Sequence, residues 1–419
     1  MNQPCARNAS KLDKQGAPKH TDKSEKIWTR NFLFILISNF FIFLGFQMTI
    51  PTIPLYVEKM GGNEQLMGLV VGIFTFSALL IRPYAGLAVD SKGRKKLYLF
   101  GLAVFVISVG SYGLIQSLLL LFMMRIVQGL GWGFSTTASG TIVTDLVPPR
   151  RRGEGMGYFG LSGNIAMAFG PSLGLILAGS LSFPLLFFAC AVLGMMAILF
   201  ALGIRYQEQK TEVRKQDVHK GIFEKSAIPP SLLIFFITFT FGGIAAFLPI
   251  YTMQKDISGI YLYFVLYAVS LLIARIFGGK IYDKKGHEAV YIPGAALIIT
   301  AMLLLAWLPN SIILFTAAIL YGFGFGTVQP ALQAWSVKEA APWRRGSANA
   351  TFFSFFDLGI GTGSIVFGQI AFAFGYASIY YISACSVALS VVLYLFLLKR
   401  ERKKKGGQKE KGPGNHPAP

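Results

Sequence analysis

Two carboxyl groups lie inside or directly beside long apolar stretches of the sequence. Asp357 stands about eleven residues into the stretch 346–398, and Asp145 follows the stretch 118–144. Removal from water favours the neutral form of a carboxyl group, unless a cation or hydrogen-bond donors hold it charged. A carboxyl group balanced in this way can bind and release a proton. We predict that Asp357 carries protons, with Asp145 as a weaker candidate and a structural, hydrogen-bonded role for Asp357 as the alternative.

One arginine also lies inside an apolar stretch. Arg125 belongs to the stretch 118–144. An arginine at membrane depth is costly and suggests a function by default. The alternative is a guanidinium group that backbone carbonyl oxygens satisfy and that holds helices together.

A charged motif occurs twice in the chain, in "RPYAGLAVDSKGRKK" and in "RIFGGKIYDKKGH". Four residues of the first copy recur 193 positions later: Arg82, Gly86, Asp90 and Gly93 match Arg275, Gly279, Asp283 and Gly286. The same offset relates "QGLGWG" to "YGFGFG", the Pro-Arg-Arg-Gly residues after each, and Asn164 to Asp357. A shared offset over separate stretches indicates two copies of one unit.

The composition is that of an integral membrane protein. Of 419 residues, 53% are hydrophobic and only 14% are charged, which is too little polar surface for a soluble domain. Crossing a membrane takes a helix of about 20 apolar residues. Uncharged or nearly uncharged stretches of that size predict twelve helices: 31–57, 65–89, 97–116, 118–144, two in 155–202, 228–253, 257–282, two in 289–336 and two in 346–398.

Lysine and arginine predict the orientation of these helices. Both tails and the loops "KGRKK", "PPRRRGE", "DKKG" and "PWRRG" fall on one side, whereas the other side has only Lys59 and Lys255. The rich side is predicted to be cytoplasmic. We therefore expect an all-α integral membrane protein with twelve transmembrane helices in two parallel six-helix bundles (31–204 and 228–398). A cytoplasmic linker (205–227) joins them, and basic cytoplasmic tails (1–30 and 399–419) flank them.

Several classes of function are not expected from this sequence. The net charge of +20 lies mainly in tails and loops, which argues against a nucleic-acid partner; the tails serve as topology signals or contact anionic lipid. Three isolated cysteines and four histidines outside the apolar stretches give no metal-binding spacing. The sequence also has no phosphate-binding loop of the G-x-x-x-x-G-K-[ST] type. We expect no metal, no cofactor and no enzymatic activity.

The segment "GLAVDSKGRKKL" resembles the signature that major facilitator superfamily transporters carry between their second and third helices. Gly86, Asp90, Gly93, Arg94 and Lys95 match it, whereas Ala88 and Ser91 depart from it. Glycine at position 86 allows helices to approach closely, and glycine at position 93 allows a tight turn. The resemblance implies a cytoplasmic gate formed by both copies of the charged motif, from Arg82 and from Arg275 onward, in which Asp90 holds the eleventh helix in the outward-open state. A loop that only anchors the topology is the alternative.

Two further helices resemble motifs of that family. "RIVQGLGWG" resembles its fourth-helix motif, whose arginine is linked to proton coupling in the antiporters, which implies this role for Arg125. The fifth helix resembles the antiporter motif, with small residues or proline at Gly157, Ala166, Gly170, Pro171 and Gly174. The proline is expected to bend the helix, and the small residues to pack at the interface between the halves. This motif is typical of exporters.

The resemblance also implies a substrate cavity lined by the first, fourth, seventh and tenth helices. Their aromatic and amide residues are Asn39, Phe43, Gln47, Gln128, Trp132, Phe239, Phe241, Gln329, Gln333 and Trp335. This mixture suits lipophilic molecules, cations included, although exposure to lipid explains any single phenylalanine as well.

These observations predict a proton-coupled exporter of small lipophilic compounds. It would act as a monomer in the cell (inner) membrane, by alternating access as in multidrug antiporters. A proton-coupled importer of sugars or organic ions is the alternative. A membrane enzyme would need clustered catalytic side chains, and a non-transporting sensor would leave the duplicated motif unexplained.

Overall fold

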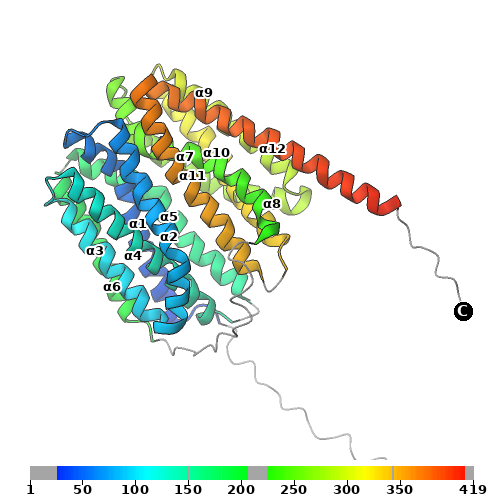
Figure 1. Cartoon of the computed structure of the whole chain (residues 1–419), viewed down its shortest axis with the longest axis horizontal. Coiled ribbons are helices and arrows are strands. Elements are labelled where there is room, and N and C mark those ends of the chain that lie inside the picture. Colours follow the sequence, from blue (N-terminus) through cyan, green and yellow to red (C-terminus); the bar gives the residue numbers. More distant parts are fainter. Residues whose placement is uncertain (1–25, 149–150, 181, 206–223, 342–343, 411–419) are drawn as a thin grey trace, which may run out of the picture.

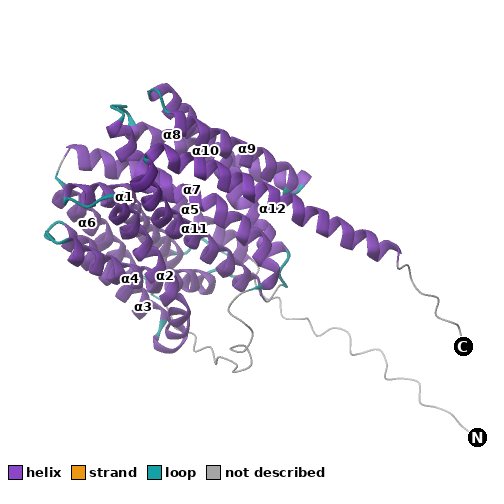
Figure 2. Ribbon diagram, turned by 45° about the horizontal axis from the view of Figure 1, so that its top comes forward, coloured by secondary structure: helices purple, strands orange, loops and turns teal. Residues whose placement is uncertain are grey.

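The computed structural model describes residues 26–148, 151–180, 182–205, 224–341 and 344–410. Figure 2 shows that these residues form helices and loops, with no strand. The first six helices are α1 (Arg30–Lys59), α2 (Glu64–Lys92), α3 (Arg94–Tyr112), α4 (Leu118–Leu146), α5 (Arg152–Ser180) and α6 (Phe183–Leu202). After the 3₁₀ turn Lys225–Ala227 come α7 (Ile228–Gln254), α8 (Ile260–Lys285), α9 (Glu288–Trp307), α10 (Ser311–Lys338), α11 (Arg345–Phe374) and α12 (Tyr376–Glu410).

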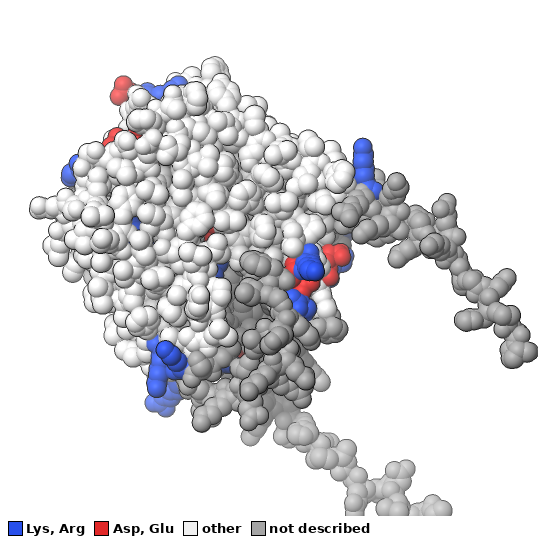
Figure 3. Space-filling view, viewed as in Figure 1, with Lys and Arg blue, Asp and Glu red and all other residues white. Residues whose placement is uncertain are grey.

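Most of these helices are long and apolar enough to cross a membrane. Within the described residues, 11 helices meet that standard of length and composition, while the apolar part assigned to α8, Ile260–Arg275, is shorter. Uncharged residues cover most of the face in Figure 3, and charged side chains gather toward its edges. The chain is therefore a multi-pass membrane protein.

Polar residues and glycines define where the helices begin and end. Asn63 accepts a hydrogen bond from the amide of Leu66 at 3.1 Å and starts α2, as Asn-capped helices do. Gly93 separates α2 from α3 with a φ of +99°, and Gly286 follows α8 with a φ of +77°. Only glycine adopts such angles without strain. The tight turn predicted at Gly93 is confirmed, and Gly286, its counterpart in the second copy, also has a positive φ.

Helices from the same part of the chain pack mainly against one another. Among the first six helices, α1 packs on α5 and α6, α3 on α4 and α6, and α2 on α4. Among the last six, α7 packs on α11, α8 and α9 on α10, and α12 on α7 and α9. The first six lie on the lower left of Figure 1 and the last six on the upper right. Contacts between the two sets join α2 to α11, α5 to α8 and α1 to α7.

The repeat in the sequence is also a repeat in packing. A Cβ added to Gly129 of α4 would lie 2.5 Å from the carbonyl oxygen of Phe74, and one added to Gly322 of α10 would lie 2.6 Å from that of Tyr267. Both the glycines and their partners are 193 positions apart. The two copies therefore use the same close helix contacts, which no larger residue would allow.

One expected boundary differs from the structure. The composition changes at residue 398, where a tail was predicted to begin, but α12 continues to Glu410 and extends beyond the other helices in Figure 1. Lysine, arginine and glutamate are good helix formers, so the charged residues prolong the helix instead of ending it.

Candidate functional site

An ion pair joins the two sets of helices. Arg82 of α2 places Nη2 2.6 Å from Oδ2 of Asp357 of α11, and about a quarter of each side chain is exposed (25% and 26%). The sequence had assigned Arg82 to a gate and Asp357 to proton transfer, without predicting that they meet. The pair links the candidate proton carrier directly to a contact between α2 and α11.

Glycines bring α2 and α11 close together beside this ion pair. A Cβ at Gly361 would lie 2.9 Å from Cβ of Thr75, and a Cβ at Gly368 would lie 2.7 Å from the carbonyl oxygen of Glu64. A Cβ at Gly68 would overlap the carbonyl oxygen of Ser364. Such small-residue contacts let helix backbones approach each other. The two helices are therefore in tight contact from Glu64, at the start of α2, to Thr75.

Two hydrogen bonds close the end at which α2 begins. Gln65 donates from Nε2 to Oε1 of Gln369 at 2.7 Å, and the hydroxyl of Tyr376 at the start of α12 donates to Oε1 of Glu64 at 3.2 Å. None of these four residues was predicted from the sequence. Their polar types at helix ends gave no signal, because such residues commonly cap helices or face water.

Arg125 is fully buried among neutral partners. Its Nε donates to the carbonyl oxygen of Val70 at 3.1 Å, and its Nη1 donates to Oε1 of Gln128 at 2.6 Å. The guanidinium carbon lies 4.5 Å from the ring centre of Phe74, and Tyr112 donates to the same oxygen of Gln128 at 2.7 Å. This network ties α2, α3 and α4 together. The role of Arg125 in proton coupling stays a prediction, and its contacts fit the structural alternative.

The other predicted proton site has a cationic partner in the same set of helices. Asp145 at the end of α4 forms an ion pair with Arg94 at the start of α3. Arg94 is thus part of a link between neighbouring helices. The contact places the carboxylate of Asp145 beside the charged loop between α2 and α3.

A second intramembrane arginine is bonded to amides. Arg275 of α8 donates from Nη2 to Oε1 of Gln329 of α10 at 2.9 Å. Gln329 donates in turn to Gln333 at 3.1 Å, and Gln333 donates to Asn349 of α11 at 2.9 Å. The two glutamines had been predicted to line a cavity. They form a chain of amides that begins at a cationic group.

The aromatic residues predicted to line the cavity form two clusters. In the first six helices, the Trp132 ring centre lies 4.8 Å from that of Phe43 and 4.2 Å from that of Phe46. Nearby, Asn39 donates to the hydroxyl of Ser162 at 2.8 Å. In the last six helices, the partners of the predicted Phe239 and Phe241 are Phe367 (4.6 Å) and Phe325 (6.0 Å).

Trp335 of α10 is buried against α12. It stacks on His287 with ring centres 4.3 Å apart and packs edge-on against Tyr394 of α12. His287 and Tyr394 share a hydrogen bond of 2.8 Å. Through these contacts Trp335 packs α10 against α12 and the start of α9, which is a structural reason for a tryptophan at this position. Its predicted place in a substrate cavity gains no support from them.

The fifth-helix motif packs elsewhere than expected. A Cβ at Gly174 would lie 2.9 Å from Cα of Met48, and a Cβ at Gly170 would overlap Gln47, both in α1. No described atom lies within 4 Å of a Cβ at Gly157, and Ala166 is buried. Pro171 lies inside the continuous helix α5. The glycine contacts are therefore within the first six helices, because the face that carries Gly170 and Gly174 turns toward α1 and not toward α8.

The duplicated charged motif is only partly visible. No described atom lies within 4 Å of a Cβ at Gly86, so the described residues show no close helix approach at this glycine, and the expected approach stays a prediction. The side chains of Asp90 and Asp283 lie outside the described part of the structure, and Gly279 lies within α8. The predicted contact from Asp90 to α11 stays a prediction.

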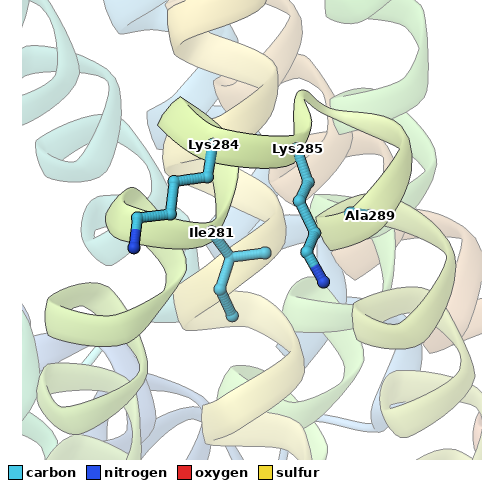
Figure 4. A pocket seen from close by; sticks show the side chains of 4 residues that line it. All are labelled: Ile281, Lys284, Lys285 and Ala289. Carbon is cyan, nitrogen blue, oxygen red and sulfur yellow. The ribbon is translucent and has the colours of Figure 1, made fainter.

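A hollow at the end of α8 offers no site for a buried substrate. Ile281, Lys284, Lys285 and Ala289 line it, and Figure 4 shows both lysines extending along its rim. It lies at the connection from α8 to α9. No group of three or more potential metal ligands occurs among the described residues.

Comparison with known proteins agrees with this architecture. The family model of the Major Facilitator Superfamily matches residues 35–342 and again 290–418. A multidrug resistance protein MdtG of Enterobacter lignolyticus is 29% identical over 404 residues, covering 89% of this chain and 93% of that protein. The quinolone resistance protein NorA of Staphylococcus aureus is 24% identical over 393 residues, covering 89% and 97%.

Other relatives have different or unassigned substrates. An uncharacterized MFS-type transporter of Methanocaldococcus jannaschii is 25% identical over 379 residues, covering 87% of this chain and 98% of that protein. Among solved structures, the nucleoside transporter NupG superposes with a TM-score of 0.67 at 17% identity, covering 88% and 99%. The human organic anion transporter MFSD10 superposes with a TM-score of 0.65 at 19% identity, covering 87% and 98%. By its sequence match across the chain and by its fold, this protein belongs to the Major Facilitator Superfamily of transporters.

Proposed function

We propose that the protein is a proton-coupled exporter of small lipophilic compounds. Two parallel six-helix halves, 31–204 and 228–398, would rock about a central site and expose it to each side of the membrane in turn. The observation that carries the proposal is the ion pair between Arg82 and Asp357. Similarity to the multidrug resistance protein MdtG supports export of lipophilic compounds.

Protonation of Asp357 is the proposed switch. A carboxylate on α11 holds the guanidinium of α2 while the two helices touch. When the carboxylate accepts a proton, its charge is lost and the ion pair is lost with it, so the two helices separate more easily. Because the pair joins the first six helices to the last six, proton binding at one atom would bias the position of one half relative to the other.

The structure is closed at the end where α2 begins, through the glycine contacts and the two hydrogen bonds of Gln65 and Tyr376. With both termini in the cytoplasm, as lysine and arginine predict, this end faces outward. We place the protein in the inner membrane and assign it a monomeric state. Asp145, Arg125 and the aromatic cluster around Trp132 are proposed to assist in coupling and in substrate contact.

Everted membrane vesicles with an acid interior test the proposal. Lipophilic compounds, sugars and amino acids would be added in turn, and collapse of the pH gradient would be followed with a fluorescent amine. Collapse by lipophilic compounds that is absent in Asp357→Asn would support proton-coupled export with Asp357 as the carrier. Collapse that survives the substitution would move the proton site, with Asp145→Asn tested next. Accumulation of sugars or organic ions in right-side-out cells would favour the importer instead.

A further inference from the structure

The interface between α5 and α8 repeats the interface between α2 and α11 with one charge missing. The offset of 193 relates α2 to α8 and α5 to α11, so the counterparts of Arg82 and Asp357 are Arg275 and Asn164. The arginine is kept in both copies, whereas the carboxylate is replaced by an amide. The protein therefore holds a cation at this second interface without the acid that balances the first.

The surroundings of Arg275 are neutral among the described residues. Its hydrogen bond goes to the amide oxygen of Gln329, and its Nε is buried with no hydrogen-bond partner. The chain through Gln333 to Asn349 adds only amides. The hydroxyl of Tyr267, two turns before Arg275 on α8, is also buried and unpartnered. The network thus carries one positive charge and more donors than acceptors.

Such an arrangement favours an anionic ligand. A buried charge without a counter-charge is costly, and a hydrogen-bonded partner of opposite charge relieves that cost. Arginine presents a planar fork of donors that matches a carboxylate. α8 faces α5 across the boundary between the two sets of helices, which is where a substrate of the proposed transporter would bind.

We propose that Arg275 binds the anionic group of the transported compound, so that the preferred substrates are lipophilic carboxylates. Asn164 leaves the guanidinium available, and Gln329 holds it in place. This inference rests on the proposed transport function and replaces the cation preference that the aromatic residues suggest. The aromatic part of the substrate and its carboxylate then occupy one site, with the carboxylate at Arg275 of α8.

Three fluorescent probes that share one ring system and chain length test the charge preference. They are 4-(pyren-1-yl)butanoate, its primary carboxamide, and the corresponding 4-(pyren-1-yl)butan-1-amine. Binding to the full-length protein in lipid nanodiscs is measured by fluorescence anisotropy, which depends on neither proton coupling nor the direction of transport. We expect the carboxylate to bind about tenfold more tightly than the carboxamide, as befits one desolvated charge contact.

Three substitutions at two positions, Arg275 and Asn164, locate the preference. Arg275→Gln should remove the tenfold advantage of the carboxylate, while Arg275→Lys, which keeps the charge, should retain part of it. Asn164→Asp supplies the acid that the first interface has, so it should weaken carboxylate binding and leave carboxamide binding unchanged. Lys284→Gln on the exposed surface of α8 is the matched loss of one charge, and it should leave all three affinities unchanged.

The outcomes separate this inference from the proposed function. A carboxylate preference that Arg275→Gln abolishes supports the inference even if the pH gradient in vesicles does not collapse. Equal binding of the three probes, tighter binding of the amine, or no binding of the carboxylate would overturn it. Collapse of the gradient by neutral or cationic compounds would then still support proton-coupled export.

Discussion

The interface between α2 and α11 and the interface between α5 and α8 are copies that have diverged. In the first, Gly68 and Gly72 of α2 pack on α11, and Arg82 pairs with Asp357. Their counterparts in α8 are Tyr261, Val265 and Arg275, with Asn164 in place of the acid. The first interface is closely packed and its two opposite charges form an ion pair. The second has larger side chains at these positions, and among the described residues its arginine is hydrogen-bonded to an amide and to no carboxylate.

This difference suggests that the two copied interfaces have different roles. A glycine-packed contact with an internal counter-charge is suited to closing, and it can be controlled by a proton on the acid. A contact with a cation held by amides is suited to binding an anion that comes from outside the chain. Sequence duplication therefore need not mean duplicated function, because a single change from carboxylate to amide alters what each interface can bind.

The largest effect is expected when the first interface is made like the second. Asp357→Asn leaves the charge of Arg82 unbalanced, which should lower transport at least tenfold and lower stability by at most about 3 kcal/mol, since a quarter of each side chain is exposed. Gradient collapse in vesicles and thermal unfolding in detergent measure the two effects. The exchange Arg82→Asp with Asp357→Arg should recover stability but not the wild-type proton response. Full transport in Asp357→Asn would show that the acid at position 357 does not give the α2–α11 interface a separate function.

A second large effect is expected at the arginine that only the first copy has. Position 318, the counterpart of Arg125, is an alanine. Arg125→Lys keeps the charge but cannot reach both Val70 and Gln128, so stability should fall by about 1–3 kcal/mol. Thermal unfolding measures this loss. An unchanged pH profile of transport would assign Arg125 a structural role, whereas a shifted profile would support its predicted role in proton coupling.

A moderate effect is expected from the glycine contact. Gly68→Ala places a methyl group against the backbone carbonyl of Ser364, and overpacking of this kind typically costs about 1–3 kcal/mol. Because this methyl group would push α2 and α11 apart, disulfide cross-linking between cysteines placed on the two helices should slow. Gly140→Ala, where no described atom lies within 4 Å, is the matched control. Equal cross-linking rates in the two variants would show that the contact is not tight.

The smallest effect is expected at an ion pair away from both interfaces. Hydrogen bonding from Ser226 and the nearby Arg344 guanidinium lower the pKa of Glu224. A carboxyl group with a lowered pKa stabilises the fold above its unfolded pKa of about 4.3 and loses that contribution as the pH falls through the folded value. The difference in melting temperature between wild type and Glu224→Gln should thus be small at pH 7 and vanish in acid. A difference that grows in acid would contradict this assignment.

The sequence identified the charged residues of the candidate site better than their partners. Asp357, Arg82 and Arg275 were all found because charge is rare in apolar stretches. The pairing of Arg82 with Asp357 was not, because a repeat reveals which positions are equivalent and not which helices touch. The pairing of Asp145 with Arg94 was not predicted, for the same reason.

Small residues were the least informative. The motif at Gly86 predicted a close helix contact that the described residues do not form, while Gly361 and Gly368, outside any quoted motif, make such contacts. Glycine permits both turns and close packing, so its type alone does not decide between them. The turn at Gly93 was predicted correctly because the motif that contains it marks the connection between two helices.

Proton release on substrate binding would show whether Asp357 couples protons to transport. Purified protein in weakly buffered detergent solution would be mixed with the pyrene carboxylate, and a pH indicator would report protons released per bound molecule. If Asp357 carries the exchanged proton, wild type should release protons when the carboxylate binds and Asp357→Asn should release none, with binding retained in both. Equal release by the two proteins would show that the proton resides elsewhere and would contradict the proposed coupling through Asp357.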